Sequence, residues 1–445
     1  MKNQYRYIWL ILGLGSALQL VASLSISELI CIVWAPLLLI SDINEIRHHG
    51  LGKFLALSFL VVCGGLVSCI VNKTPGYFFL RGMAVACLMP CVILVSHRLI
   101  ARDPAGFKWY LLGGAISAVL STFVFQKSVE VTMLAGGIKD ANTAELIISG
   151  PIYWINRAGS FVMLPIKGWY LSTPFAYSVL APILFGVFSI LTSASGRSAA
   201  VVSMFSAALV FAGGKSIRTM RRLSRHMILL IVLAIILSFG LKAIYQYAAQ
   251  EGILGENARL KLEAQTKGRT DMLSLLIGGR IDSLAGYLAC IDHPIIGMGA
   301  CPIDEKGYFE NFLRRFGNAE DYENYVRNRA WEMSMGLSKS HMVPAHSSIV
   351  IFWLQFGIFG FIFWMYMLYT LYHYIHYDLV SVPSWFGWLV LTIPSFLWDA
   401  FFSPFSGRVG VPMIIVACLM ARAVRQNKFN LPLSMVNERI KFFKR

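Results

Sequence analysis

Long apolar segments separated by short polar loops run through most of the chain. A helix that crosses the hydrocarbon core of a bilayer needs about 20 mainly apolar residues, and many of these segments reach or approach that length. The pattern predicts a succession of membrane-spanning helices on both sides of one long polar stretch, residues 245–346. The predicted spans lie near 7–24, 27–41, 53–72, 77–97, 108–125, 173–195, 198–213, 226–244, 347–376, 383–399 and 408–424.

The composition indicates the same class of protein. Hydrophobic residues make up 57% of the 445 positions, and charged residues make up 14%. A soluble domain usually carries about 25% charged residues. The composition therefore excludes an ordinary soluble protein and predicts an integral membrane protein with helical spans.

The formal net charge of +16 is distributed in a way that argues against a nucleic-acid partner. Lysines and arginines gather in short loops between predicted spans and in the C-terminal tail. Short basic loops follow the positive-inside rule, which records orientation. We therefore expect these loops and the N-terminus to be cytoplasmic. The basic stretches are residues 47–53, 98–108, 215–225 and 422–445.

The number of crossings is balanced everywhere except in the middle of the chain. Three spans are predicted between Lys108 and Lys215, although two cytoplasmic flanks require an even number. We expect the missing crossing within 126–172, as a split span or a re-entrant piece, since irregular or charged backbone at membrane depth must be covered by protein or water. The predicted fold is all-α and polytopic, with about 12 transmembrane helices. Its parts are N-terminal spans at 1–244, a large, partly helical loop outside the cytoplasm at 245–346, and C-terminal spans with a basic cytoplasmic tail at 347–445.

Three residues are candidates for phosphate and proton chemistry at the outer membrane face. Arg197 follows a predicted span, Arg280 lies in the long loop, and His346 stands where that loop meets the next apolar segment. Guanidinium groups bind phosphate oxygens in paired hydrogen bonds and stay charged at any relevant pH. A histidine titrates near neutral pH and can accept the proton of an attacking hydroxyl. Together, the three residues are suited to holding a lipid-anchored diphosphate and activating an acceptor.

Each residue also has a simpler explanation when it is considered singly. An arginine at the end of a span, such as Arg197, commonly anchors the helix at the interface. Arg280 lies close enough in sequence to Asp282 for a local ion pair, and His346 alone fits an interfacial histidine. The motifs around these residues favour the chemical interpretation.

The histidine is followed by a pair of glycines at a particular spacing. His346-Ser347 precedes the nine residues Ser348 to Phe356, and Gly357-Ile358-Phe359-Gly360 follows. This arrangement resembles the O-antigen ligase and O-antigen polymerase superfamily, bacterial membrane enzymes that act on undecaprenyl-diphosphate-linked glycans. The ligases in particular look like this around their essential histidine.

Three further motifs occur in the order typical of that family. Asn156–Phe161 is similar to the family's arginine-x-x-glycine-x-phenylalanine stretch, although the usual proline-asparagine pair does not follow it. Leu191–Ala199 resembles the threonine/serine-arginine element at a span end. Gly279-Arg280, followed by Asp292–Gly299, looks like the loop signature of an arginine and then a His-Pro-x-x-Gly-x-Gly turn.

The resemblance implies a glycosyl transfer that uses neither a metal nor another cofactor. Arg197 and Arg280 would bind the diphosphate, with Arg157 as a further candidate, and His346 would be the general base. The sequence shows no clear Asp-x-Asp arrangement for a divalent ion that bridges a diphosphate, which agrees with arginines neutralising the charge. The resemblance further implies direct displacement with inversion at the anomeric carbon.

The resemblance also implies partners and a location. The donor would be an undecaprenyl-diphosphate-linked glycan, and the acceptor would be lipid A-core or another glycan. Membrane lipids are expected partners and nucleic acid is not. The chain would be a multi-pass protein of the bacterial inner (cytoplasmic) membrane, with its long loop and active site on the periplasmic face.

Several functions remain open on the sequence. The histidine–glycine spacing favours an O-antigen ligase, but a polymerase that joins lipid-linked repeat units shares most motifs, and a fold or family does not by itself fix function. A protein-directed branch with a serine acceptor is a third possibility. A flippase of lipid-linked glycans is the alternative from another class. It would predict inverted repeats and charges near mid-bilayer, whereas the candidate cations here gather at one outer face.

Most of the cysteines lie in apolar spans, where we expect them to act as small packing residues. Cys290 and Cys301 lie in the long loop. A disulfide between them is one possibility, but its formation depends on geometry that a sequence does not give.

Overall fold

The computed structural model shows a helical protein. The residues that it describes are 2–16, 19–21, 24–48, 50–107, 109–110, 112–114, 116–117, 246–247, 250–251, 282–300, 302–304, 306–316, 323, 343–345, 347–375, 393, 396–397, 400–401 and 409–425. Among these, four helices are long and apolar enough to cross a membrane: Ile26–Arg47, Gly52–Val71, Phe78–Arg102 and Ser348–His373. This confirms a helical membrane protein, while the count of about 12 crossings and the large outer loop stay predictions.

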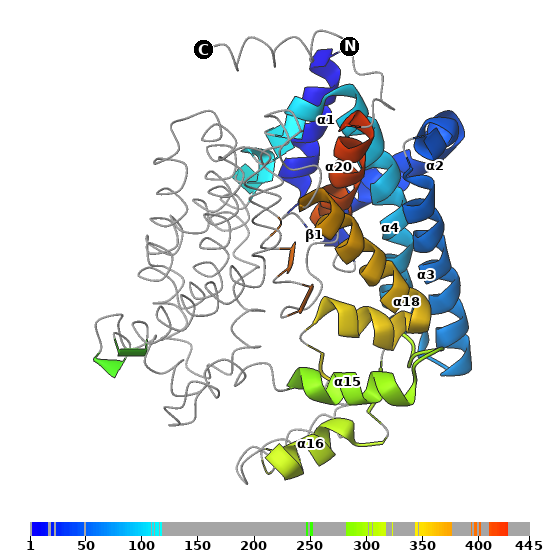
Figure 1. The fold of residues 1–445 in the computed structure, drawn as a ribbon, viewed down its shortest axis with the longest axis vertical. Helices are drawn as coiled ribbons and strands as arrows, with labels where there is room; N and C mark the ends of the chain where they lie inside the picture. Colours follow the sequence, from blue (N-terminus) through cyan, green and yellow to red (C-terminus); the bar gives the residue numbers. More distant parts are fainter. Residues whose placement is uncertain are drawn as a thin grey trace.

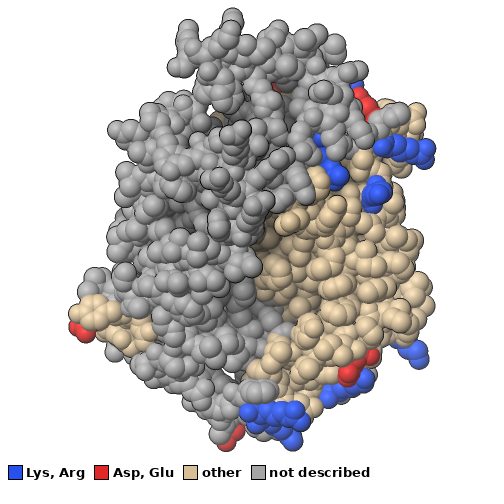
Figure 2. Space-filling view, in the orientation of Figure 1, with Lys and Arg blue, Asp and Glu red and all other residues tan. Residues whose placement is uncertain are grey.

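Three consecutive helices form one side of the described structure. Helices α2 (Ile26–His48), α3 (Gly52–Val71) and α4 (Gly76–Arg102) pack together, and α4 contacts both of the others (Figure 1). Their outward faces carry exposed aliphatic side chains, among them Val33 at 75% and Ile40 at 83% exposure. Figure 2 shows an uncharged surface here between charged groups at both ends. Such a surface suits contact with lipid, where no water satisfies polar groups.

The short helix α20 (Gly410–Arg425) and the second part of helix α18 (Ser348–His373) complete this core. Small residues of α3 allow α18 to approach closely. A Cβ atom at Gly64 would lie 2.7 Å from the Phe359 ring, and one at Gly65 would lie 2.8 Å from the Phe356 ring. Small residues at helix contacts are typical of membrane proteins, because association there depends on close van der Waals packing.

The N-terminal region differs from the predicted span at 7–24. Helix α1 (Lys2–Gly15) ends early, and a small antiparallel hairpin of β1 (Gln19–Val21) and β2 (Leu24–Ser25) follows it. The helix docks through Trp9, which is fully buried and whose indole N–H donates a 2.9 Å hydrogen bond to the carbonyl of Asp103. That carbonyl directly precedes the 3₁₀ turn η1 (Pro104–Gly106). Hydropathy could not reveal the hairpin, because it records apolar content and not backbone direction.

Helix α18 is broken, although the sequence predicts one continuous span at 347–376. Gly357 has φ 63° and ψ −150°, which is not helical. Figure 1 shows the chain turning within α18: the first part runs beside helix α15 (Asp282–Asp292), and the second part runs back toward α20. The second part also packs on α3, where the ring of Phe363 stacks on that of Phe54. Only 16 residues, Ile358–His373, remain for the part along α3, about 24 Å at 1.5 Å per residue.

Helices α15 and α16 (Tyr308–Phe316) form a second, smaller core beside the first part of α18 (Figure 1). Ala285 of α15 packs with Phe312 and Leu313 of α16. The carboxylate of Asp304, which is 1% exposed, accepts hydrogen bonds from the backbone N–H groups of Tyr308 at 2.6 Å and Phe309 at 2.9 Å. A capping carboxylate satisfies N–H groups that the first helical turn leaves without partners.

Candidate functional site

The four predicted site residues Arg157, Arg197, Arg280 and His346 lie outside the described residues. The structure does describe segments directly adjacent to two of them. Helix α15 begins at Asp282, two positions after Arg280, and helix α18 follows His346 with Ser347 between them. The framework around these two residues can therefore be built from described contacts, while the roles of all four side chains stay predictions.

Helix α15 and the first part of α18 pack side by side and run in the same direction. Near its start, α15 meets the chain before α18: a Cβ atom at Gly286 would lie 2.9 Å from the carbonyl oxygen of Pro344 and 3.3 Å from Cβ of Ala345. Further along, the thiol of Cys290 lies 3.7 Å from the carbonyl oxygen of Val350. The contacts advance along both helices together, so the pair is parallel (Figure 1).

This parallel packing has a chemical consequence at one end of the pair. Both N-termini lie at the same end, next to the sequence positions of Arg280 and His346. A helix N-terminus carries a partial positive charge and N–H groups without intrahelical partners. Two N-termini side by side form a setting that favours an anion such as a phosphate. The sequence did not reveal this arrangement, since it depends on a close contact at Gly286.

Ser347 fixes the start of α18. Its backbone is extended, its hydroxyl oxygen accepts a 3.4 Å hydrogen bond from the N–H of Val350, and its hydroxyl donates a 2.8 Å hydrogen bond to the carbonyl of Ala400. Only 5% of Ser347 is exposed. The hydroxyl thus caps the helix and joins it to another segment. A serine before an apolar run is a cap signal, but the bond to Ala400 was not visible in the sequence.

The turn after α15 meets α18 at its break. The backbone N–H of Met298 donates a 2.6 Å hydrogen bond to the carbonyl of Leu354, and the N–H of Ile358 donates a 2.9 Å bond to the carbonyl of Ile295. The indole N–H of Trp353 donates a 2.9 Å bond to the carbonyl of Pro294. Two motifs that are far apart in the sequence, the His-Pro-x-x-Gly-x-Gly turn and the Gly-x-x-Gly pair, therefore form one structural unit.

A polar group joins α15 to α16 beside this unit. The hydroxyl of Tyr308 donates a 2.6 Å hydrogen bond to Oδ2 of Asp292, and Nζ of Lys306 lies 3.9 Å from the same oxygen. Burial and this hydrogen bond raise the pKa of Tyr308 above its ordinary value. Tyr308 therefore stays a neutral donor over the physiological pH range and holds α16 against the end of α15.

Cys290 is a free, buried cysteine in the structure. Burial raises the pKa of its thiol to about 12, so the reactive thiolate is suppressed. Cys301 lies outside the described residues. The disulfide that the sequence left open is thus not formed by Cys290 here, and Cys290 serves in the contact between α15 and α18.

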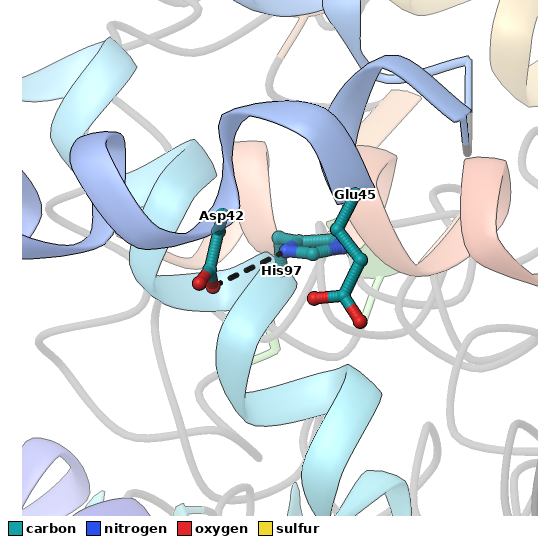
Figure 3. A group of neighbouring side chains, drawn as sticks. All are labelled: Asp42, Glu45 and His97. Atoms are coloured by element: carbon teal, nitrogen blue, oxygen red, sulfur yellow. Dashed lines mark ion pairs between the residues drawn. The ribbon is translucent and has the colours of Figure 1, made fainter.

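Among the described residues, a group of metal-ligand types lies at the opposite ends of the spans from α15. It consists of Asp42 and Glu45 on α2 and His97 on α4, with ligand atoms within 4.8 Å of one another (Figure 3). Asp42 Oδ2 lies 3.8 Å from Nδ1 of His97, while Oδ1 lies 2.7 Å from Nη2 of Arg98. The guanidinium neutralises the carboxylate and opposes a metal cation. We interpret this group as an ion pair that joins α2 to α4.

Comparison with known proteins gives one family. Residues 181–365 match the family described as O-antigen ligase. A search of curated proteins and a search of solved structures found no match. The matched range includes the positions of Arg197, Arg280 and His346, and the glycine break at Gly357, but not Arg157. The match confirms the resemblance to the O-antigen ligase and polymerase superfamily and indicates a membrane enzyme of that type.

Proposed function

Because residues 181–365 match the family described as O-antigen ligase, we propose that this chain is a membrane glycosyltransferase of the ligase type. It transfers a polysaccharide from undecaprenyl diphosphate to a hydroxyl of lipid A-core. The family match supports this proposal most strongly, and the paired helices α15 and α18 give the reaction a suitable framework. The protein would work in the bacterial inner membrane with its site on the periplasmic face.

The proposed reaction is a direct displacement at the anomeric carbon of the donor sugar. The acceptor oxygen forms a bond to this carbon as the bond to the diphosphate oxygen breaks. The leaving diphosphate keeps the electron pair, and His346 takes the proton of the acceptor hydroxyl. Arg197 and Arg280 neutralise the charge that develops on the diphosphate, with Arg157 as a further candidate. Metal-independent chemistry needs this neutralisation from fixed cations.

The helix framework supports the shared location of base and diphosphate. Gly286 brings the start of α15 against Pro344 and Ala345. In the sequence, Arg280 lies just before α15 and His346 lies just before α18. Two positive helix ends add to the attraction for a diphosphate. A base must come within hydrogen-bond reach of the proton that it removes, and a parallel helix pair is a rigid way to set that distance.

The reaction can be tested with purified protein in proteoliposomes and a defined undecaprenyl-diphosphate-linked oligosaccharide, with and without lipid A-core. The ligase proposal predicts glycan attached to lipid A-core. A lengthened chain on the carrier lipid would instead identify a polymerase. If donor supplied on the outer side gives neither product, the enzyme proposal fails and the flippase alternative gains support.

Variants test the assigned roles separately. His346→Ala is expected to reduce transfer to a small residual rate while donor binding remains, and Arg280→Ala is expected to weaken donor binding. His373→Ala, at the other end of α18, and Arg315→Ala, on an exposed position of α16, are matched controls that should keep both properties. Retained transfer in His346→Ala, or unchanged donor binding in Arg280→Ala, would contradict the respective assignment.

A further inference from the structure

The break in α18 depends on two glycines with backbone conformations that other residues do not adopt easily. Gly357 has φ 63° and ψ −150°, a region that is essentially restricted to glycine. Gly297, in the turn after α15, has φ 76°. An L-residue with positive φ is strained by its Cβ atom. Each glycine thus allows a chain reversal that a helix or an ordinary turn would not provide.

The same two glycines also allow the two backbones to touch. A Cβ atom at Gly357 would collide with the carbonyl oxygen of Ile295 and lie 2.7 Å from the carbonyl carbon of Ile296. A Cβ atom at Gly297 would lie 2.6 Å from the carbonyl oxygen of Leu354. In both cases the obstacle is backbone, which cannot move aside as a flexible side chain can. The contact is therefore specific to glycine for conformational and steric reasons.

Gly360 allows a further close approach, between the two parts of α18. A Cβ atom there would collide with the carbonyl of Phe352, on the preceding part of the same helix. The second glycine of the Gly-x-x-Gly pair thus lets the two parts of α18 fold closely against each other. The spacing of this pair has a structural explanation in the turn of the chain at Gly357.

The unit is anchored to the end of α3. The side-chain N–H of Asn72 donates a 3.2 Å hydrogen bond to the carbonyl of Gly297, and the N–H of Ala300 donates a 3.3 Å bond to Sγ of Cys69. The amide of Gln355 donates a 3.2 Å bond to the carbonyl of Ala300. The turn is therefore bonded on one side to α3 and on the other side to α18.

We propose that Gly357 and Gly297 are positioning residues for the transfer reaction. They hold the first part of α18 and helix α15 together as a parallel pair, and this pair sets the relative position of the two helix starts, which lie next to Arg280 and His346 in the sequence. This inference rests on the proposed function, because it assigns the contact between Gly297 and Gly357 a role in that reaction. The glycines act through the backbone and touch no substrate.

The test measures transfer and donor binding of Gly357→Ala in proteoliposomes. We expect kcat to fall by about a hundredfold, since a misplacement of about 1 Å can have that effect. Donor affinity should stay within about twofold, because the side chains that bind the donor are unchanged. A milder variant, Trp353→Phe, removes the bond to Pro294 and should lower kcat about fivefold, the effect of about 1 kcal/mol from one hydrogen bond.

Two glycines provide matched controls. Gly76→Ala places a methyl group at the start of α4, where nothing lies within 4 Å. Gly50→Ala introduces the strain of a positive φ of 73°, again with nothing within 4 Å. Both variants should retain kcat. If Gly50→Ala loses as much activity as Gly357→Ala, general backbone strain explains the effect and the proposal is wrong.

A combination with His346→Ala separates positioning from loss of structure. If Gly357 acts by placing the base, Gly357→Ala adds little further loss once the imidazole is absent, because the two changes are strongly non-additive. Additive losses would overturn the proposal. Should Gly357→Ala fail to fold in a detergent melting experiment, Trp353→Phe gives the same comparison, and full activity in that variant would equally overturn it.

These outcomes also distinguish the proposed function from the positioning role of the glycines. Full transfer by the single variant His346→Ala would contradict the proposed function itself. Loss of transfer in His346→Ala together with full transfer in Gly357→Ala would leave the proposed function intact and remove the positioning role alone.

Discussion

Ile358 and Ile295 are joined by a backbone hydrogen bond of 2.9 Å across the break at Gly357. One belongs to the apolar segment after the candidate histidine, and the other belongs to the turn after the candidate arginine. In a continuous helix, the N–H of Ile358 would bond to the residue four positions earlier. Here it bonds to a segment far away in the sequence instead, and this hydrogen bond connects α18 to the turn after α15.

Gly286 should be sensitive to added volume. In Gly286→Ala the new methyl group would lie 2.9 Å from the carbonyl oxygen of Pro344, so α15 must move away from the residues before His346. We expect a loss of stability of about 1–3 kcal/mol, as in other overpacked sites, and a lower kcat. Melting in detergent and transfer kinetics measure the two effects. Gly410→Ala, where nothing lies within 4 Å, is the control, and equal behaviour of both variants would contradict the close contact.

Ser347→Ala should weaken the start of α18. The substitution removes the cap at Val350 N and the hydrogen bond to Ala400. Loss of a cap costs about 1 kcal/mol and loss of a hydrogen bond a similar amount, so a decrease of about 2 kcal/mol in unfolding free energy is expected. Ser347→Thr keeps a hydroxyl on an extended backbone and should lose less. Identical unfolding free energies for the Ala and Thr variants would argue against a role for the hydroxyl.

Asp42→Asn should destabilise the contact between α2 and α4. The carboxylate is 2% exposed and pairs with Arg98 at 2.7 Å. Removing one partner of a buried ion pair leaves an uncompensated charge and typically costs about 3–5 kcal/mol. Arg98 retains 18% exposure, so the lower end of that range is expected. Glu45→Gln, on an exposed position of the same helix, should change stability by less than about 0.5 kcal/mol. Melting of both variants in detergent decides the comparison.

The contact between α15 and α16 should weaken at high pH. The pKa of Tyr308 is raised by burial and by the hydrogen bond to Asp292. A raised folded-state pKa gives stability that is fully present below the unfolded value of about 10 and is lost as pH rises through the folded value. Stability should therefore fall above about pH 10, and Tyr308→Phe should reduce that dependence. Melting of both proteins across this pH range tests the sign, and a fall that is unchanged in Tyr308→Phe would assign it to another group.

Local sequence information determined four of the helices that the structure describes. Segments predicted at 27–41, 53–72, 77–97 and 408–424 correspond to α2, α3, α4 and α20, with ends that differ by a few residues. Apolar runs of this kind have few alternatives in a membrane, because every backbone polar group must be satisfied within the helix. The motifs also indicated a resemblance to O-antigen ligases, which the match over residues 181–365 supports. The roles of Arg197, Arg280 and His346 stay predictions.

Only the tertiary structure decided how these pieces meet. The break at Gly357 lies within a run that hydropathy describes as one uniform span, and its cause is a partner, Ile295, far along the chain. The contact at Gly286 and the ion pair between Asp42 and Arg98 likewise depend on which helices become neighbours. Hydropathy records the average environment of a segment. A strained backbone, a close approach of two helices and an ion pair each depend on specific neighbouring residues. Those neighbours are determined only when the chain packs.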